Sequence, residues 1–548
     1  MDVFIVDGPP WSTVHVGERT VHVAGFLAGI DQVKSIIKKP GALNAQKLDK
    51  VLAKANEQFA LLVVGADEVY AAVDRIRSYP LFYHSNHSSI FASHDAHWVA
   101  KRAGLSKFNS TSVFEFSMSG YVSGQETLLE GVLQLQAGER IYWSKGGQGP
   151  NRLRYYSYIP SPVVYASEKD RIQQLSEIVD RAISRTINVS NGAPIWIPLS
   201  GGLDCRLILC KLLEHGYDNI QTFSYGIRNN NEATVAQKIA RHLGVRWRHV
   251  LPQTKRARRL FRDGSREDYW KFADGLCSIP SLREFDAFTY LKNRGLIQDD
   301  AVVINGQSGD FITGGHIRAA WLGDGPFGGV DDLLQAIQDK HYALWPGLLG
   351  SNGSDLVRQK ISKVLDDIPT ASKEDLISLY ESWEWQERQS KYVCNGQRVY
   401  DYLGLKWTLP LWDGEFMDFW ETASYEEKVG QALYTKYLKH YDYEGMFKNY
   451  RRTLYTFPPA LRWLFLVGKA IGLFAGNARK QEFYQNMSYF GSYHHQYAYY
   501  GFSHFLARSK QIRGPVSLLV ETWLEEHGIE FSALTELENP SKAVFERM

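Results

Sequence analysis

The sequence has few cysteines, and their spacing excludes several classes of protein. Only four occur in 548 residues, and no two of them stand in the Cys-x-x-Cys pattern of a structural zinc site. So small a number also excludes a disulfide framework and is typical of a reducing compartment. We therefore expect a cytoplasmic protein. The cysteines are Cys205, Cys210, Cys277 and Cys394.

The sequence also lacks a strong net charge and a long apolar run. It has 62 basic and 60 acidic residues, a net charge of +2, which gives no reason to expect a nucleic-acid partner. No stretch approaches the roughly 18 apolar residues of a membrane span, and "MDVFIVDGPPW" is not typical of a signal peptide. At about 150 residues per domain, the length predicts about two to four domains.

Three regions of different character follow one another. Residues 1–160 contain short β segments separated by Gly, Asn, Asp and Ser, among them "ALLVVG", "EVYAAV", "SSIFAS" and "RIYWS", and they predict a layered β-rich domain. A segment with two prolines near 155–166 predicts a linker. Residues 167–440 then alternate strands with helices, and residues 441–548 are mostly helical and rich in aromatic residues.

The second region predicts a parallel sheet. Ser167 and Asp170 stand at capping-box spacing, so a helix of about 20 residues is expected to follow them. The strands expected next are "IWIPL", "IQTFSYG", "RWRHVL" and "AVVIN". In such sheets ligands bind beyond the carboxyl ends of the strands. The loops "SGGLD" and "GQSGDFITGG" each leave a strand at that end, so we expect them to face one crevice.

The loop "SGGLD" has the residue types that phosphate binding requires. Ser200 offers a hydroxyl group, Gly201 and Gly202 let backbone N–H groups approach an anion, and the next helix adds its N-terminal dipole. A carboxylate beside phosphates needs a cation between them, so Asp204 is interpreted as a magnesium ligand. The alternative is a tight turn between strand and helix, because Ser-Gly-Gly alone also occurs by chance.

Several segments resemble, in order, those of the asparagine synthetase family. "PLSGGLDCR" resembles its pyrophosphatase-type loop, usually SGGLDS, and "FSYGI" with "NEATVAQKIARHLGV" its adenine-side strand and next helix. "INGQSGDFITGGH" resembles its second loop, normally Gly-Glu-Gly-x-Asp-Glu, and "LPLWDGEFMDFW" its Pro-(Phe/Leu)-Leu-Asp segment. "VDRIRSYPLFY" and "ETLLEGVLQLQAGERIYW" resemble the glutaminase half. The resemblance covers roughly residues 55–440.

The resemblance implies an α/β protein with two domains and an extension. A glutaminase-like, Ntn-hydrolase-type β-rich domain is expected over 1–160, a PP-loop synthetase domain of the adenine nucleotide α-hydrolase-like type over 167–440, and a helical extension over 441–548. The implied reaction is carboxylate activation by ATP, which gives an acyl-adenylate and pyrophosphate, followed by displacement of AMP by an amine. ATP and Mg²⁺ are the implied cofactors.

The same resemblance assigns site residues. Asp204 and Asp310 fall on the magnesium-pyrophosphate aspartates, and the lysine that family members add for the pyrophosphate would be Lys436 or Lys448, neither of which lies in an alignable motif. The residues expected to bind the nucleotide are Leu199, Ser200, Gly201, Gly202, Asp204, Cys205, Ser224, Tyr225, Gly226, Glu232, Gly306, Gln307 and Ser308.

The sequence also departs from the family. Glutamine-dependent members begin with a cysteine that attacks the glutamine amide, whereas this sequence begins "MDV" and its first cysteine is Cys205. We therefore expect the first domain not to release ammonia from glutamine, so that ammonia or an amine is the nitrogen source. Gln307 occupies a position where the family usually has a glutamate, and Phe311 one where it has an acidic residue. These replacements predict a substrate other than aspartate. Cys205 replaces a serine, and it is interpreted as a small substitute rather than as a nucleophile with a lowered pKa.

The substrate remains open between several hypotheses. Relatives with the Gln-Ser-Gly-Asp-Phe form of the second loop resemble enzymes of bacterial surface-polysaccharide biosynthesis, for which the expected reaction converts a sugar uronate into its uronamide. Ring closure by an internal amine, as in β-lactam or lasso-peptide formation, is the second hypothesis, and asparagine synthesis from ammonia is the third. A nucleotide-binding scaffold without turnover and a transfer-RNA thiolating enzyme are alternatives of other classes. An oligomer is compatible with each of them.

The stretch "LRWLFLVGKAIGLFAG" is apolar but short, and Arg462 and Lys469 interrupt it. We expect it to form a buried core helix. The alternative is contact of the 461–505 region with a membrane surface, because tryptophan, phenylalanine and basic residues are typical of interfacial helices. In that case the protein would be peripheral at the inner face of the membrane.

Overall fold

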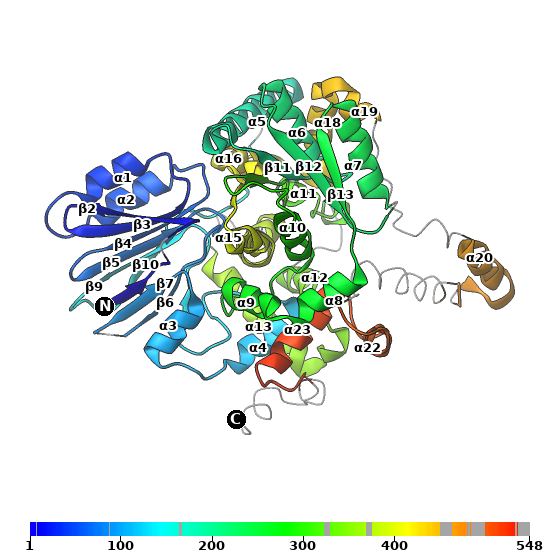
Figure 1. The fold of residues 1–548 in the computed structure, drawn as a ribbon. Coiled ribbons are helices and arrows are strands. Elements are labelled where there is room, and N and C mark those ends of the chain that lie inside the picture. Colours follow the sequence, from blue (N-terminus) through cyan, green and yellow to red (C-terminus); the bar gives the residue numbers. More distant parts are fainter. Residues whose placement is uncertain are drawn as a thin grey trace.

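The structure is a computed structural model, and it describes residues 1–6, 8–86, 88–163, 167–228, 230–322, 329–368, 375–449, 463–477, 479–480, 483, 499–531 and 534. A β-rich first domain lies beside a larger α/β second domain (Figure 1). Part of the 461–505 region that we interpreted above lies outside these residues. None of the described helices combines the length and the apolar character that crossing a membrane requires.

The first domain contains two sheets, and the four β segments expected from the sequence lie in them. The larger sheet has the order β10-β9-β5-β4-β3-β2 and is antiparallel throughout. Its strands are β2 (Trp11–Val16), β3 (Arg19–Gly25), β4 (Phe59–Val64), β5 (Glu68–Val73), β9 (Glu139–Ser144) and β10 (Asn151–Arg154). The smaller sheet has the order β1-β7-β6-β8, with β1 (Asp2–Phe4), β6 (Phe82–Ser85), β7 (Ile90–Ser93) and β8 (Leu133–Gln134).

Helices close both sides of this domain. Helices α1 (Ile30–Ile37) and α2 (Ala45–Leu52) bury Val33, Ile37, Leu48 and Leu52 against the larger sheet, in a core separate from that of the rest of the molecule. Helices α3 (Ala96–Ala103) and α4 (Ser110–Ser119) contribute to the main core instead. These helices are short because glycine or turn residues end them, which explains why the sequence showed few helical periods.

The second domain is built on the predicted parallel sheet, with one additional strand. Its order is β13-β12-β11-β14-β15, and every neighbouring pair is parallel. The strands are β11 (Ile195–Pro198), β12 (Ile220–Tyr225), β13 (Arg246–Val250), β14 (Val302–Ile304) and β15 (Lys406–Thr408). Helices α6 (Asp204–Glu214) and α7 (Asn231–His242) connect β11 to β12 and β12 to β13. Strand β15, only three residues long, was not predicted.

The helix predicted after Ser167 is α5 (Glu168–Ser190), and the hydroxyl of Ser167 accepts the backbone N–H of Asp170 at 3.2 Å. The remaining helices of this domain include a π-helix at Glu384–Val393. The others are α8 (Thr254–Arg262), α9 (Gly264–Ala273), α10 (Arg283–Asn293), α11 (Gly309–Ile312), α12 (Val330–His341), α13 (Ser351–Asp367), α14 (Leu376–Trp383), α15 (Arg398–Tyr402), α16 (Gly414–Glu421), α17 (Tyr425–Lys428), α18 (Ala432–Tyr441) and α19 (Met446–Asn449).

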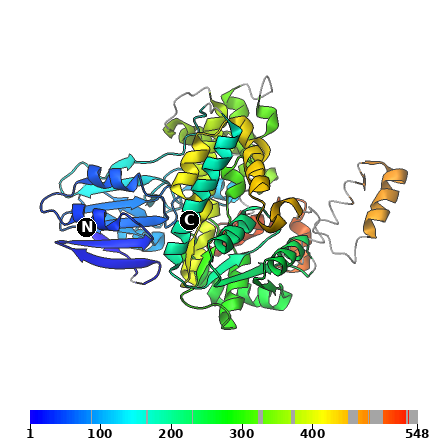
Figure 2. The same ribbon diagram turned by 90° about the horizontal axis from the view of Figure 1, so that it is seen from above.

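The two domains lie side by side (Figure 2), and buried polar contacts join them. The π-helix supplies several of them, because its Trp385 Nε1 donates to the carbonyl of Arg75 at 2.9 Å, and its Glu387 accepts the N–H of Gly124 at 2.9 Å. Lys391 donates to the carbonyl of Gly124 in the first domain and pairs with Glu387 of its own helix at 2.6 Å, and both side chains are fully buried. On α16, Glu421 accepts the hydroxyl of Tyr156. We call this set of contacts the domain interface.

The C-terminal region contains helices of opposite character. Helix α23 (Pro515–Glu526) is docked, since Trp523 packs edge-on against Phe116 of α4 and its indole N–H donates to Asp274 at 3.0 Å. Helix α22 (Phe502–Arg508) buries one residue, Phe505. Helix α20 (Leu464–Ala475) projects away from the body of the molecule in both views (Figures 1 and 2). The expectation of a buried core helix there was wrong, because periodicity shows which residues are apolar but not what covers them.

Candidate active site

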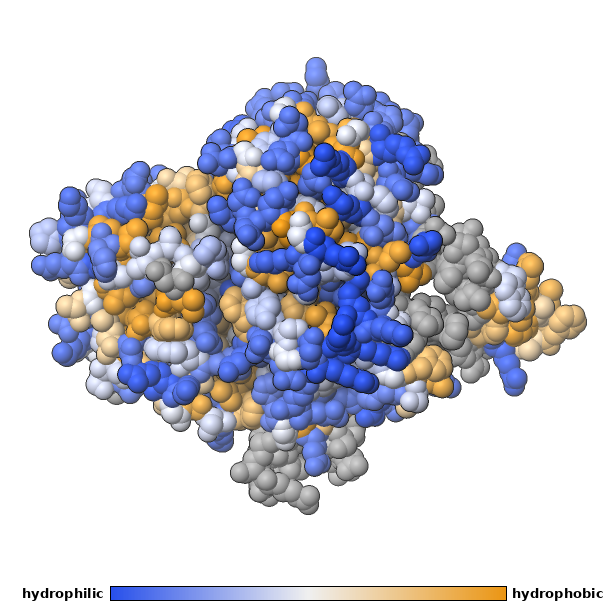
Figure 3. All heavy atoms as spheres, viewed as in Figure 1, coloured by the Kyte–Doolittle hydropathy of each residue, from blue (hydrophilic) through white to orange (hydrophobic). Residues whose placement is uncertain are grey.

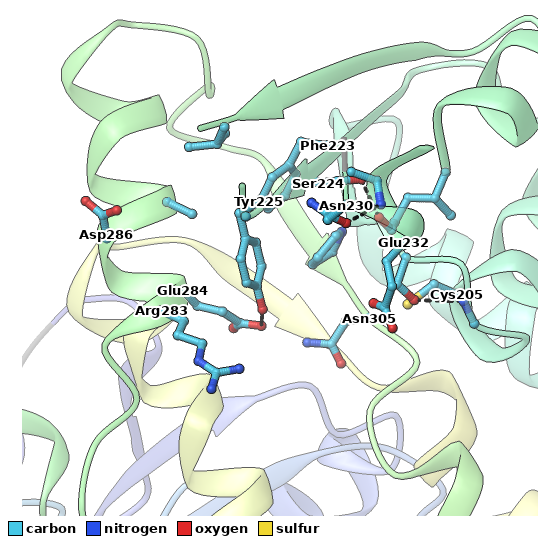
Figure 4. Close-up of a pocket in the computed structure, with 18 of the residues that line it drawn as sticks. Cys205, Phe223, Ser224, Tyr225, Asn230, Glu232, Arg283, Glu284, Asp286 and Asn305 are labelled. Atoms are coloured by element: carbon cyan, nitrogen blue, oxygen red, sulfur yellow. Dashed lines mark hydrogen bonds between the residues drawn. The ribbon is translucent and has the colours of Figure 1, made fainter. Parts of the chain in front are cut away.

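Two adjoining cavities lie at the carboxyl edge of the parallel sheet. The first has a volume of about 490 Å³ and lies between the loop after β11, the end of β12 and helix α10 (Figure 4). The second, of about 800 Å³, lies between the loop after β11 and the loop after β14. They share six lining residues, so the two loops face one crevice as the sequence predicts. The shared residues are Ser200, Gly202, Asp204, Glu232, Gly306 and Gln307.

Every residue predicted to bind the nucleotide lines at least one of these cavities. The first cavity contains Leu199, Cys205, Ser224, Tyr225 and Gly226 besides the shared residues. The second contains Gly201, Ser308 and Asp310. The sequence therefore identified residues that the fold brings together from loops more than 100 positions apart.

A buried arginine that sequence reasoning missed holds the glycine loop in place. The Arg206 guanidinium donates to the carbonyl of Gly201 at 2.7 Å and to that of Met446 at 2.8 Å. Within the loop, the Gly202 N–H donates to Ser200 Oγ at 3.0 Å. Because Arg206 binds a carbonyl of the loop from within the protein, the loop conformation is fixed before any ligand arrives.

The two loops approach each other closely at Asp204, and glycine is required there. A Cβ added to Gly306 would lie 2.5 Å from Asp204 Cβ, and one added to Gly309 would lie 2.5 Å from Asp204 Cγ. Asp204 Oδ1 accepts the hydroxyl of Tyr434 at 2.9 Å, so helix α18 also positions this carboxylate. These contacts place Asp204 at the junction of the two loops.

Asp310 also lines the second cavity, but in a different environment. Its side chain is 63% exposed, and its carboxylate lies 3.5 Å from His316 Nε2. Burial by the surrounding protein raises the pKa of Asp310, but the hydrogen bond and charge of His316 and the Phe311 N–H outweigh it, so the pKa lies below its ordinary value. Asp310 is therefore ionised at neutral pH.

A buried charge cluster behind Asp310 was also missed. Glu384, the first residue of the π-helix, is fully buried, and it accepts hydrogen bonds from His316 Nδ1 at 2.6 Å and from Lys340 Nζ at 3.0 Å. Burial lowers the pKa of His316, but its hydrogen bonds to Asp310 and Glu384 raise it to about 9. The cluster comes from three separate elements, so no local pattern in the sequence signals it.

The wall of the first cavity that faces α10 carries polar side chains (Figure 4). Glu284 accepts the hydroxyls of Tyr400 at 2.7 Å and Tyr225 at 3.5 Å, and its burial raises its pKa above the ordinary value. Arg283, next to it on α10, also lines the cavity. Ser224 is part of the framework, since its hydroxyl donates to the carbonyl of Leu199 at 2.6 Å.

The two candidate lysines occupy different places. Lys448 lines the second cavity together with Lys439, which was not predicted. Lys436 lines neither cavity, and its ammonium group pairs with Glu168 at the surface. Lys448 is thus the candidate that the fold places beside the glycine loop.

Cys205 is not suited to act as a nucleophile. Its Sγ accepts the Gly306 N–H at 3.3 Å, which ties the start of α6 to the second loop. Burial raises the pKa of its thiol to about 12, even though that hydrogen bond lowers it. The thiol is therefore protonated at neutral pH, as the interpretation of a serine substitute requires.

The described residues contain no group of three or more His, Cys, Asp and Glu side chains arranged to hold a metal ion without help. Asp204 and Asp310, however, line the same cavity. Mg²⁺ is commonly bound by one or two carboxylates, with phosphate and water oxygens completing its shell, so this pair fits an ion that enters with a nucleotide.

Comparison with known proteins gives one informative match. Residues 174–443 match the family model described as asparagine synthase. No curated protein matches the chain. Solved structures that match include the glutamine phosphoribosylpyrophosphate amidotransferase from B. subtilis complexed with ADP and GMP, at 9% identity over 49% of this chain and 75% of that chain, with a TM-score of 0.19.

Another is described as the allosteric regulatory enzyme of purine biosynthesis, at 11% identity over 54% of this chain and 56% of that chain, with a TM-score of 0.18. Neither likeness is close enough to carry an argument. The family match does carry one, because its range contains the parallel sheet and both glycine loops. The segment formed by residues 174–443 is therefore an asparagine synthetase-like ligase domain.

Proposed function

We propose that the protein is an ATP-dependent, AMP-forming amide ligase that adenylates a carboxylate and transfers the acyl group to ammonia or an amine. The observation that supports this most is the pairing of two glycine loops, with Asp204 and Asp310, around one cavity. The match of residues 174–443 to the asparagine synthase model indicates the same chemistry.

The reaction has two steps. A carboxylate oxygen of the substrate attacks the α-phosphorus of ATP, the bond from that phosphorus to the bridging oxygen breaks, and pyrophosphate leaves. The nitrogen lone pair then attacks the acyl carbon, the bond from that carbon to the AMP oxygen breaks, and AMP leaves with the electron pair. The amide nitrogen loses its surplus proton to solvent.

In the first step an anionic carboxylate must approach the anionic phosphates of ATP, and in the second step AMP leaves as an anion. Charge neutralisation is therefore the main task of the site. The glycine loop offers backbone N–H groups and the N-terminus of α6, and Lys439 and Lys448 add positive charge in the second cavity. Mg²⁺ held by Asp204 and Asp310 would add charge neutralisation at the phosphates when bound.

The nitrogen source in this proposal is ammonia or an amine of the substrate. Residues 1–204 contain no cysteine, so within them no thiol is available to attack a glutamine amide. We expect ammonium to support turnover and glutamine not to. A glutamine-dependent formation of glutamate would contradict this part of the proposal.

For the substrate we propose a sugar uronate, converted into its uronamide during surface-polysaccharide biosynthesis. Gln307 and Phe311 stand in the second loop at positions where the family has acidic residues, so the site differs from one built for aspartate. Arg283, Asn305 and Gln307 line the first cavity and offer hydrogen bonds to a carboxylate and to hydroxyl groups.

The test is a panel of substrates. Purified protein is supplied with ATP, Mg²⁺, ammonium and, in turn, uronates, amino acids and linear peptides, and AMP and pyrophosphate are measured. We expect release with a uronate, and a loss of about a hundredfold or more in Asp204→Ala. Turnover of a peptide would favour ring closure, and turnover of aspartate would favour asparagine synthesis. Absence of release with every carboxylate would contradict the ligase proposal.

A further inference from the structure

Helix α20 carries a continuous apolar stripe on its outer face. Trp463 at its N-terminus is 58% exposed, Leu466 67%, Leu473 84% and Phe474 91%. These positions, together with exposed Ala470, are spaced by three, four, three and one residues, so they lie within one third of the helix circumference. Figure 3 shows the corresponding apolar surface on the projecting part of the molecule.

The opposite face of α20 is the one that packs on protein. Gly468 is buried there, and a Cβ added to Gly472 would lie 2.7 Å from Lys480 Cδ. The stripe therefore points away from the nearest described neighbour. Large apolar side chains gathered at this exposure are typical of a surface that binds a partner.

The charge of the surrounding sequence indicates which partner. Between Glu444 and Glu482 there is no acidic residue. The same segment has seven basic residues, which are Lys448, Arg451, Arg452, Arg462, Lys469, Arg479 and Lys480. Nearly neutral overall, the chain thus concentrates positive charge around its most exposed apolar helix. An apolar face with tryptophan and phenylalanine and a basic rim is complementary to an anionic bilayer surface.

The length of α20 limits how it can meet a bilayer. Its 12 residues extend about 18 Å, well short of the roughly 30 Å of a hydrocarbon core. A helix of this length with one apolar face lies parallel to the membrane plane, with that face among the acyl chains and Lys469 among the headgroups.

We propose that α20 is an interfacial anchor that docks the protein on an anionic lipid bilayer through Trp463, Leu466, Leu473 and Phe474. The segment that carries α20 begins and ends at the active site, since Lys448 lines the second cavity and Tyr499 lines the first. Docking therefore tethers to the membrane the two chain segments that line the cavities. This consequence rests on the proposed function, whereas docking itself does not.

The test measures binding of the full-length protein to sedimented vesicles without ATP. We expect binding to vesicles of phosphatidylcholine mixed with phosphatidylglycerol, weaker binding to phosphatidylcholine alone, and a decrease as salt rises. The double variant Leu473→Glu with Phe474→Glu should lose about tenfold or more of the binding. The matched control is Val14→Glu with Leu153→Glu, which changes two exposed apolar residues of the first domain and should bind as the wild type does.

Three results would overturn the proposal. They are absence of binding to anionic vesicles, binding that the α20 double variant leaves unchanged, and a stable dimer in sedimentation velocity that this variant dissociates. With a water-soluble carboxylate substrate, release of AMP from ATP should be the same in wild type and in the double variant. Absence of AMP release in both proteins, with vesicle binding of the wild type intact, would contradict the proposed function and leave the anchor proposal standing.

Discussion

The carboxyl edge of the parallel sheet and the domain interface use the same residue types in opposite ways. At the edge, Asp310 is 63% exposed to a cavity and has a lowered pKa. At the interface, the Lys391 and Glu387 side chains are fully buried and paired with each other. The interface directs its charges to internal partners, whereas the edge presents them to a ligand. A charged side chain alone therefore does not indicate a functional site, and the groups with which it pairs must also be known.

The largest effect is expected from breaking the buried pair of the interface. Lys391→Met keeps the length of the side chain but leaves Glu387 buried and without its cation. Because an uncompensated buried charge is costly, we expect a loss of about 3–5 kcal/mol in the free energy of unfolding. Urea unfolding followed by circular dichroism measures it.

The matched control replaces both members of the pair. Lys391→Met with Glu387→Gln removes the unpaired charge and should recover part of the lost stability, because the amide oxygen that Glu387→Gln introduces can still accept the Gly124 N–H. A single variant that loses less than about 1 kcal/mol would show that water reaches this pair and that the interface is less closed than its burial indicates.

The next effect concerns Glu421 at the same interface. Burial raises its pKa from the ordinary value of 4.5 to about 7, although the Tyr156 hydroxyl lowers it. Between these values the folded state keeps a proton that the unfolded state releases, so stability falls as pH rises through this window, by up to about 3 kcal/mol. Below pH 4.5 both states are protonated and the pH dependence from this group vanishes.

Glu421→Gln cannot titrate and keeps a group that accepts the Tyr156 hydroxyl. We expect its free energy of unfolding to decline less than that of the wild type between about pH 5 and pH 8. Urea unfolding of both proteins at the two pH values provides the comparison. Parallel pH dependences of wild type and variant would contradict the assignment of this slope to Glu421.

The sequence predicted the features whose signals come from residues close together along the chain. The Ser167 cap, the parallel strands and the glycine loops all have local signals, and the structure confirms them. Three site residues have no such signal, because each contacts a residue that is distant in the sequence. Glu384 binds His316, Arg206 binds the carbonyl of Met446, and Tyr434 binds Asp204. The same reason applies to α20, since only the three-dimensional structure shows that nothing described covers its stripe.

A smaller effect, on the KM for ATP, is expected from the two candidate lysines of the active site. Lys448→Ala removes a cation that lines the second cavity and pairs with Asp442 at 3.0 Å, and we expect the KM for ATP to rise about tenfold. Lys436→Ala is the matched control, because Lys436 pairs with Glu168 at the surface and should leave the KM within about twofold. Steady-state kinetics of AMP release distinguishes them, and a reversed order would move the pyrophosphate contact to Lys436.

The smallest effect is expected at Cys205. Because its thiol is protonated and accepts the Gly306 N–H, a serine hydroxyl should replace it with a change in kcat of less than about threefold. The rate of AMP release measures this change. A loss of most activity in Cys205→Ser would restore the hypothesis of a reactive thiol and of thiolation chemistry.

The central claim is that the edge of the sheet adenylates a carboxylate. Exchange of labelled pyrophosphate into ATP tests it most directly, because this exchange requires only ATP, Mg²⁺ and the carboxylate and is independent of the nitrogen source. We predict carboxylate-dependent exchange in the wild type and in Glu421→Gln, and a loss of about a hundredfold or more in Asp204→Ala and Asp310→Ala. Exchange that persists in both aspartate variants would contradict the claim.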